Sequence, residues 1–271
     1  MNNDILSQVK MSTVGGDGVG NIPMPPTFND PLEQRAYIKH RLAAAFRLFA
    51  YYQFDDGLAG HITARDPVEP DTFWVNPVSL HFSMIRASDL VRLDHKGQLV
   101  EGNALVNLAA FVIHSRIHAR HQHIHSVAHA HSPRGRAWSA FGQPLQPLTQ
   151  DGCVFFERHR VFSNFNGVVH HSEEGDAIAD HFEDGNIALI LQNHGLLSVG
   201  RDVDSAVSLF VQLERACETQ LMVQAAGNDF QPILPEIARK TRNFTGSELV
   251  VWGNYQPQYQ MIARLQPDLL E

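Results

Sequence analysis

Two histidines separated by a single residue give the clearest indication of chemistry in this sequence. His129 and His131 lie in segment 126–131, whose small and apolar residues predict a buried strand. On a strand, residues i and i+2 project from the same face with Cα atoms about 6–7 Å apart, so both imidazoles can reach one ion. A pair of surface histidines would show the same spacing. The apolar residues before the pair and Pro133 after it favour a strand that runs into the core and ends there.

A third histidine has the position expected of a further ligand. His194 follows the apolar segment 187–192, a predicted strand, and precedes Gly195, which allows another group to approach closely. A loop histidine that merely ends the strand is the alternative interpretation. Three histidines with an open fourth position are the ligand set of a catalytic metal ion rather than a structural one. Such an ion polarises a carbonyl or activates a bound water molecule.

The composition favours metal or proton-transfer chemistry and excludes several other classes. Sixteen of the 271 residues are histidines, and eight of these lie between His114 and His159. The net charge of −8 argues against a nucleic-acid partner, because phosphate binding needs a positive face. No run of about 18 apolar residues is present, so we expect no membrane span and no membrane partner. Cys153 and Cys217 cannot form a disulfide framework, which predicts a cytoplasmic protein.

The elements that must position these histidines belong to one domain of mixed helices and strands. Residues 1–30, rich in glycine and proline, predict a flexible N-terminal arm, or alternatively an arm that wraps a neighbouring subunit. Asp30 and Pro31 predict the start of a helix, and the longest helical pattern covers residues 203–226. We therefore expect a single domain over residues 31–271. Its last part, from about 228 to 271, contains four prolines and predicts an irregular extension with one short helix at most.

Three motifs resemble those of the class II aldolase/adducin head family. They are His-Ser-Arg-Ile-His at 114–118, Val-Ala-His-Ala-His-Ser-Pro at 127–133 and Leu-Gln-Asn-His-Gly-Leu-Leu at 191–197. The resemblance covers residues 31 to about 227. It implies a three-layer α/β/α sandwich around a central mixed, largely antiparallel sheet. It also implies a homotetramer whose active sites lie between subunits.

The same resemblance implies a ligand set and a cofactor. The family's metal-binding histidines match His129, His131 and His194, so the expected cofactor is one divalent ion per subunit, either zinc, manganese or iron. The tyrosine acid that a neighbouring subunit contributes in this family aligns with Gln150. The family's glutamate, which serves as acid/base, falls at Ala110 and is therefore missing, which leaves the general acid/base of this chain open.

Further departures from the family argue against a sugar phosphate as substrate. Sugar-phosphate aldolases of the family have a Gly-Asn-x-Ser turn, where this chain has Gly-His-Ile-Thr at 60–63. Their Thr-Gly phosphate loop corresponds to Val78-Ser79 here. Most of the hydroxyl groups that would hold a phosphate are thus absent. We expect a small carboxylate that carries no phosphate.

The residues at or near the positions of these missing family residues are the candidates for catalysis. His61 occupies the position of the asparagine, and His81 follows the former phosphate loop, so each is a candidate acid/base group or carboxylate partner, or else a polar loop residue. Arg134 follows the strand of the histidine pair and is a candidate for two-pronged recognition of a carboxylate. Solvated helix faces are the default interpretation for Arg136 and Glu214, although Glu214 could contact a ligand imidazole. Four further histidines are expected on an exposed stretch: His118, His121, His123 and His125.

These features predict a divalent-metal-dependent carbon–carbon lyase of decarboxylase or aldolase type. Its substrate would be a small non-phosphorylated carboxylate, aromatic acids included, cleaved through a metal-stabilised enolate or carbanion. The segment 60–67 is similar to the branch of the family that includes pyridine-dicarboxylate decarboxylases. One alternative is a non-haem iron oxygenase that cleaves an aromatic keto or hydroxy acid. A second alternative is an adducin-like interaction module without catalysis.

Overall fold

The computed structural model describes residues 23–168, 172–227 and 229–271. The α-helices are α2 (Pro31–Tyr51), α3 (Leu108–Arg120), α4 (Pro133–Ser139), α5 (Ser172–Asp180), α6 (Val203–Ala226), α7 (Pro235–Thr245) and α8 (Glu248–Leu265). The strands are β1 (His61–Arg65), β2 (Thr72–Val75), β3 (Val91–Asp94), β4 (Leu99–Glu101), β5 (Ser126–Ala130), β6 (His159–Phe162), β7 (Ala188–Leu191) and β8 (Gly195–Gly200). Short 3-10 helices are η1 (Phe82–Met84), η2 (Ala87–Asp89), η3 (Asp151–Phe155) and η4 (Pro267–Leu270).

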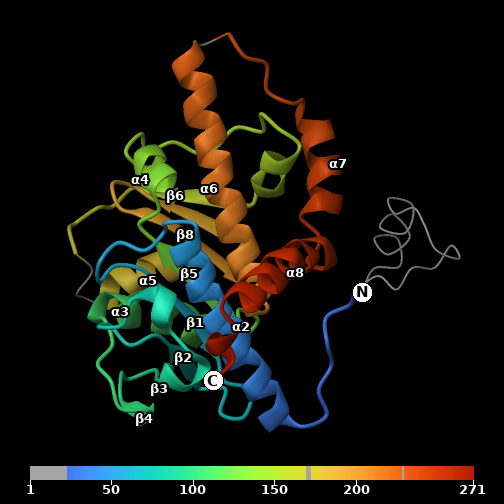
Figure 1. The fold of residues 1–271 in the computed structure, drawn as a ribbon. Coiled ribbons are helices and arrows are strands. Elements are labelled where there is room, and N and C mark those ends of the chain that lie inside the picture. Colours follow the sequence, from blue (N-terminus) through green and yellow to red (C-terminus); the bar gives the residue numbers. More distant parts are fainter. Residues whose placement is uncertain (1–22, 169–171, 228) are drawn as a thin grey trace, which may run out of the picture.

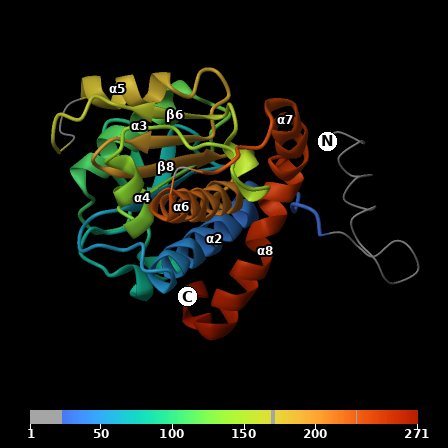
Figure 2. The same ribbon diagram turned by 90° about the horizontal axis from the view of Figure 1, so that it is seen from above.

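One sheet organises these elements, and it confirms the predicted fold class. Its strand order is β4-β3-β2-β1-β5-β8-β7-β6. Only the edge pair β6–β7 of this sheet is parallel, and the other neighbours are antiparallel. Figure 2 shows the sheet between two helical layers, with α3 and α5 on one side and α2, α6 and α8 on the other. The chain is thus a three-layer α/β/α sandwich.

The two faces of the sheet carry separate apolar cores, because side chains alternate along each strand. Ala128 and Ala130 of β5 pack in the core under α2 and α6, together with Phe46 and Phe210. Val127 faces the other core, under α3 and α5. By this alternation, His129 faces the side of α3 and α5, as does His131, the residue after the strand. The side on which Val127 is buried therefore indicates the side that His129 and His131 face.

The helix that starts the described domain begins where the sequence predicts. Asp30 is the N-cap of α2, and its carboxylate accepts a hydrogen bond of 2.8 Å from the backbone N–H of Leu32. The predicted flexible arm falls mostly on residues 1–22, which lie outside the described residues. Among the helices that are described, none combines the length and the apolar character that a bilayer span requires.

The prediction of an irregular C-terminal extension is wrong. Helices α7 and α8 occupy most of residues 235–265, and α8 buries Trp252, Tyr255 and Ile262. Figure 1 shows α8 crossing α2 and α6 on one side of the molecule. Pro235 lies in the first turn of its helix, where proline needs no N–H partner and favours the helical φ. A count of prolines misjudged this region, because Pro235 and Pro267 each begin a helix and Pro257 is accommodated inside α8.

Candidate metal centre

Three imidazoles converge at one end of the sheet. One ligand nitrogen from each of His129, His131 and His194 lies within 4.8 Å of the other two. The ring of His194 is 4.8 Å from each of the other two rings, and those two are 5.2 Å apart. Two nitrogens that each lie about 2.0–2.1 Å from one zinc ion are at most about 4.2 Å apart, so three nitrogens within 4.8 Å of one another need only a small side-chain shift to share an ion. The donor set therefore fits the cofactor that the sequence predicts.

The turn between β7 and β8 brings His194 to the pair on β5. Strand β8 pairs with both β7 and β5, so its first residue lies beside the end of β5. Asn193 adopts a positive φ of 57°, a conformation that asparagine tolerates better than most residues. A Cβ atom at Gly195 would lie 2.8 Å from the carbonyl oxygen of Ala130. The glycine after His194 is therefore required for the close approach of β8 to β5.

The environment of the three histidines keeps them neutral, which is the form that binds metal. Burial lowers the pKa of His194 to about 4 and holds the pKa of His129 well below its usual value. The pKa of His131 is also lowered, by burial and by the positive charge of Arg136. Nδ1 of His129 lies 2.8 Å from the carbonyl oxygen of Leu196. This bond assigns the proton to Nδ1 and leaves Nε2 for the metal.

His61 lies directly beside the metal candidates. It is the first residue of β1 and pairs in register with His129 of β5, with the two rings 5.0 Å apart. The residue is 4% exposed, and neither ring nitrogen has a hydrogen-bond partner among the described residues. Burial lowers the pKa of His61 to about 3. A buried imidazole with two free nitrogens at this place is available to a bound substrate.

Two histidines of helix α3 extend this buried polar group away from the metal candidates. The ring of His114 is 4.6 Å from that of His61. The hydroxyl of Thr63 lies 2.8 Å from Nδ1 of His114 and 2.8 Å from Nε2 of His118. Both histidines are fully buried, so the expected exposure of His118 is wrong. His121 is also buried, so its expected exposure is wrong as well. Its Nε2 lies 2.8 Å from the carbonyl oxygen of Ala179.

The two other candidates for catalysis each contact a carboxylate. His81 is exposed and its Nε2 lies 2.7 Å from a carboxylate oxygen of Asp55. Arg134 donates from Nε to Glu218 over 3.2 Å. In the described part of the chain, neither residue forms a hydrogen bond or ion pair with the three converging histidines. The roles of His81 and Arg134 thus stay predictions.

Arg136 is an exposed helix residue, as its default interpretation expects, whereas Glu214 is buried. Arg136 pairs with Asp56 at 2.6 Å, and the charges of both residues influence the pKa of His131. Glu214 is 2% exposed and accepts hydrogen bonds from the segment that follows His131. The signal that could have identified Glu214 is its place on α6 among apolar residues, where an unpaired carboxylate would be costly. The side chain at Ala110, the position of the missing glutamate, lies outside the described part.

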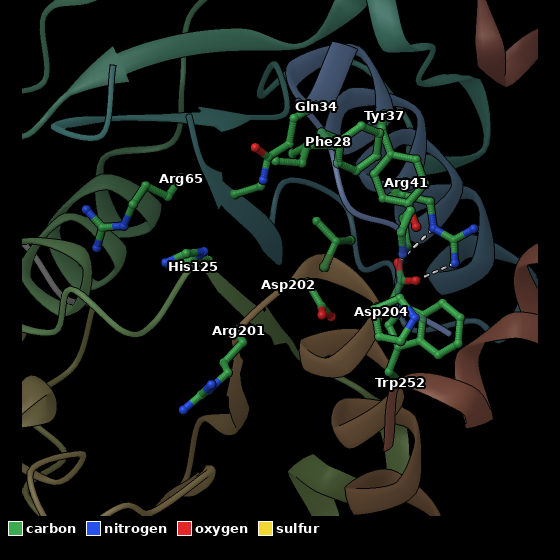
Figure 3. A pocket seen from close by; sticks show the side chains of 15 residues that line it. Phe28, Gln34, Tyr37, Arg41, Arg65, His125, Arg201, Asp202, Asp204 and Trp252 are labelled. Atoms are coloured by element: carbon green, nitrogen blue, oxygen red, sulfur yellow. Dashed lines mark hydrogen bonds and ion pairs between the residues drawn. The ribbon is translucent and has the colours of Figure 1, made fainter. Parts of the chain in front are cut away.

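A cavity of about 180 Å³ lies at the opposite end of the strands and is not part of this centre. Residues from the end of β1, the start of β5 and the end of β8 line it, whereas His61, His129 and His194 lie at the other ends of these strands. Figure 3 shows that Arg41 and Asp204 at its rim bind each other. The guanidinium of Arg65 points away from the cavity, toward the backbone carbonyls that it binds.

Two known proteins are similar to this chain over most of its length. The chain is 45% identical over 247 residues to the decarboxylase NovR of Streptomyces niveus, covering 90% of this chain and 91% of that protein. It is 44% identical over 247 residues to the 4-hydroxy-3-prenylphenylpyruvate oxygenase/4-hydroxy-3-prenylbenzoate synthase of Streptomyces roseochromogenus subsp. oscitans, covering 90% of this chain and 88% of that protein.

A solved structure and a family model extend the comparison. The structure of an L-fuculose 1-phosphate aldolase from Glaciozyma antarctica superposes with a TM-score of 0.85 at 38% identity, covering 92% of this chain and 97% of that chain. Residues 40–221 match the model of the class II aldolase and adducin N-terminal domain. The chain therefore belongs to the class II aldolase/adducin family.

Proposed function

We propose that this protein is a divalent-metal-dependent carbon–carbon lyase of decarboxylase or aldolase type. The observation that carries the proposal is the convergence of three neutral imidazoles, from His129, His131 and His194, within 4.8 Å of one another. When bound, a divalent ion supplies Lewis-acid stabilisation of negative charge that develops on a substrate oxygen. The family contains enzymes and adducin heads, and this triad favours an enzyme.

The substrate that we propose is a small carboxylate without phosphate, most suitably an aromatic keto or hydroxy acid. Val78 and Ser79 replace the phosphate-binding Thr-Gly, so few hydroxyl groups remain to hold a phosphate. One relative is named as a decarboxylase, and another is named for a prenylated phenylpyruvate and a prenylated benzoate. These names support a carboxylate, and they support an aromatic ring in particular.

Three side chains are the proposed contacts of the substrate. His61 offers two buried nitrogens without partners, and it is the proposed group that holds or moves a proton. Arg134 and His81 are the proposed carboxylate partners. Their present partners, Glu218 and Asp55, are carboxylates themselves, so a substrate carboxylate would replace an interaction of the same kind. The proposed assembly is a cytoplasmic homotetramer with one ion per subunit.

The test uses purified protein from which metal has been removed by a chelator. It is reloaded with Zn²⁺, Mn²⁺ or Fe²⁺ and incubated without oxygen with a panel of aromatic keto acids, hydroxy acids and dicarboxylates. We expect one metal-loaded form to release carbon dioxide or an aldehyde. A sugar phosphate serves as the control and should not react. Release that is independent of metal, or turnover of the sugar phosphate alone, would contradict the proposal.

An oxygenase is the second candidate, and a specific observation favours it. A relative 44% identical over 247 residues is named as an oxygenase. Three histidine nitrogens also suit Fe²⁺ with positions left for substrate and oxygen. The same panel incubated with Fe²⁺ in air separates the two candidates. Oxygen consumption equal to product formed, with no turnover under argon, would favour the oxygenase over the lyase.

The role of His61 has its own test. We expect His61→Asn to retain the metal, because His61 is not one of the three converging ligands. Turnover should fall by about 100-fold or more, the usual contribution of a positioned acid/base group. A matched control is His125→Asn, an exposed histidine at the other end of β5. Unchanged turnover in His61→Asn would contradict this role, as would loss of the metal.

A further inference from the structure

The segment after His131 begins a helix that lacks a cap of its own. Ser132 is the N-cap of α4, but its side chain accepts no hydrogen bond from the helix. Pro133 follows in the first turn and has no N–H to donate. The backbone N–H groups of Arg134 and Gly135 therefore need an acceptor from elsewhere, since buried helix ends without partners are costly.

Glu214 of α6 supplies that acceptor. Its Oε1 accepts a hydrogen bond of 2.9 Å from the N–H of Arg134, and its Oε2 accepts one of 2.7 Å from the N–H of Gly135. The hydroxyl of Ser132 donates to the same Oε2 over 2.5 Å. A carboxylate is well suited to a helix N-terminus, where the peptide dipoles leave a partial positive charge. With three donors bound and 2% exposure, this carboxylate has little capacity left for a substrate.

The capped turn directly follows His131 and is linked to His129 through Leu196. His131 directly precedes Ser132, and in the described part of the chain no hydrogen bond holds the His131 imidazole. The position of this ring therefore depends on the backbone that Glu214 fixes. A Cβ atom at Gly135 would lie 2.5 Å from the side chain of Leu196, so α4 packs very closely on the start of β8. Leu196 in turn provides the carbonyl that binds Nδ1 of His129.

We propose that Glu214 is a positioning residue for the metal centre. By capping α4 from α6, its carboxylate fixes the backbone next to His131, and through the packing of Gly135 on Leu196 it fixes the acceptor of His129. Its removal would let two of the three ligands shift and would weaken metal binding. The proposal rests on the proposed function, because it assumes that the three histidines hold a metal.

The test is the Zn²⁺ affinity of Glu214→Gln, measured by competition with a chromophoric chelator. Glutamine keeps the size of the side chain, but its NH₂ group would oppose one of the N–H donors of α4. We expect Zn²⁺ to bind about 10- to 100-fold more weakly than in wild type, the usual effect of losing an outer partner of a metal site. The visible spectrum of the Co²⁺-loaded variant should also shift, because the ligand geometry changes.

Asp66→Asn provides the matched control. Asp66 is also a buried carboxylate that accepts several hydrogen bonds, but it follows the far end of β1. Both variants should lower the melting temperature, whereas only Glu214→Gln should change the Zn²⁺ affinity and the Co²⁺ spectrum. If Glu214→Gln does not fold, Ser132→Ala removes one of the three donors and leaves the carboxylate in place. That variant should weaken Zn²⁺ binding by about two- to fivefold.

The outcomes separate this proposal from the proposed function. If the wild type binds Zn²⁺ and Glu214→Gln binds it within about threefold as tightly with an unchanged Co²⁺ spectrum, Glu214 has only a structural role and the positioning proposal is wrong. If Ser132→Ala stands in, unaltered Zn²⁺ affinity has the same meaning. If the wild type itself binds no Zn²⁺, Mn²⁺ or Fe²⁺, the metal centre and both proposals fail together.

Discussion

At the scale of single residues, burial changes what each histidine can do. A surface imidazole titrates near neutral pH, but burial lowers the pKa of His61 to about 3 and that of His194 to about 4. Both are therefore neutral under physiological conditions. Neutral imidazoles can bind a cation or exchange hydrogen bonds with a substrate. Neutral imidazoles at these places are therefore available for either interaction.

Removal of one ligand should abolish metal retention. We expect His194→Ala and His131→Ala to lose bound metal during gel filtration, because two histidines alone hold a divalent ion weakly at this site. The matched control is His123→Ala, whose side chain is exposed. Metal content is measured by mass spectrometry of the digested protein. Equal loss in His123→Ala would show that the wrong cluster has been identified.

Asp66 should make stability depend on pH in the acid range. Burial would raise the pKa of this carboxyl, but hydrogen bonds from Arg35 and Trp74 and from backbone N–H groups outweigh it and lower the pKa below its ordinary value. The stabilisation is complete above the pKa of the unfolded chain, near pH 4, and is lost as the pH falls through the lower folded pKa. Urea unfolding should show wild type more stable than Asp66→Asn by about 1–3 kcal/mol at pH 6. A difference that does not narrow by pH 3 would contradict this assignment.

At the scale of elements, the centre depends on where strands end. His61 begins β1, His131 follows β5 and His194 precedes β8, so the pairing of these neighbouring strands brings the residues together. His61, His131 and His194 thus lie at or just beyond strand ends, not in the middle of a strand. Two of these junctions contain a positive φ, at Gly60 before β1 and at Asn193 before β8. Precise strand pairing is therefore a condition for the metal centre.

Gly195→Ala should disturb that pairing. The added Cβ would lie 2.8 Å from the carbonyl oxygen of Ala130, so β8 would have to move away from β5 and carry His194 with it. We expect a loss of about 1–3 kcal/mol in the free energy of unfolding, together with weaker metal binding. Gly253→Ala in α8 is the control, because a Cβ there meets no atom within 4 Å and alanine favours the helix. Denaturant unfolding that finds the two variants equally stable would contradict this account.

At the scale of the whole molecule, each helical layer has a distinct task. Helices α3 and α5 cover the face of the sheet toward which His129 points, and α3 brings His114 beside His61. Helix α6, on the other face, supplies Glu214 to the turn after His131. The centre thus receives contributions from both layers and from the sheet between them. Binding of a metal should accordingly stabilise the fold as a whole.

Metal removal should lower the global stability. We expect Zn²⁺ at 100 times its dissociation constant to raise the free energy of unfolding by about 2.7 kcal/mol over that of the chelator-treated protein. The chelator-treated protein should therefore unfold at a lower temperature. Differential scanning calorimetry measures the change. His194→Ala is the control and should show no Zn²⁺-dependent shift. Stabilisation of the wild type and of His194→Ala to the same degree would indicate binding elsewhere.

The proposed assembly can be measured independently of activity. Light scattering after gel filtration should give a mass four times that of the 30.3 kDa chain. The expectation rests on the resemblance to the class II aldolase/adducin family. A mass that matches one or two chains would contradict the homotetramer and leave the metal centre to be tested by itself.

The sequence by itself determined the features that local chemistry encodes. Because His129 and His131 are two residues apart, they share one face wherever this segment is an extended strand. Asp30 caps its helix by a hydrogen bond to a residue two positions along the chain. Helix 203–226 was predicted with its observed bounds because its apolar period continues without interruption. The C-terminal helices were missed, because Pro235 lies in a first turn and Pro257 is tolerated inside α8, whereas a count treats every proline as a helix breaker.

Only the tertiary structure decided which distant groups meet. The burial of His118 and the cap that Glu214 provides depend on contacts between segments 55 and 80 residues apart, and no local pattern specifies such contacts. The same holds for β8, whose short run of residues is a strand because β5 and β7 lie on either side of it. Short-range spacing fixes which face a side chain takes, whereas its neighbours are fixed by packing among all the layers.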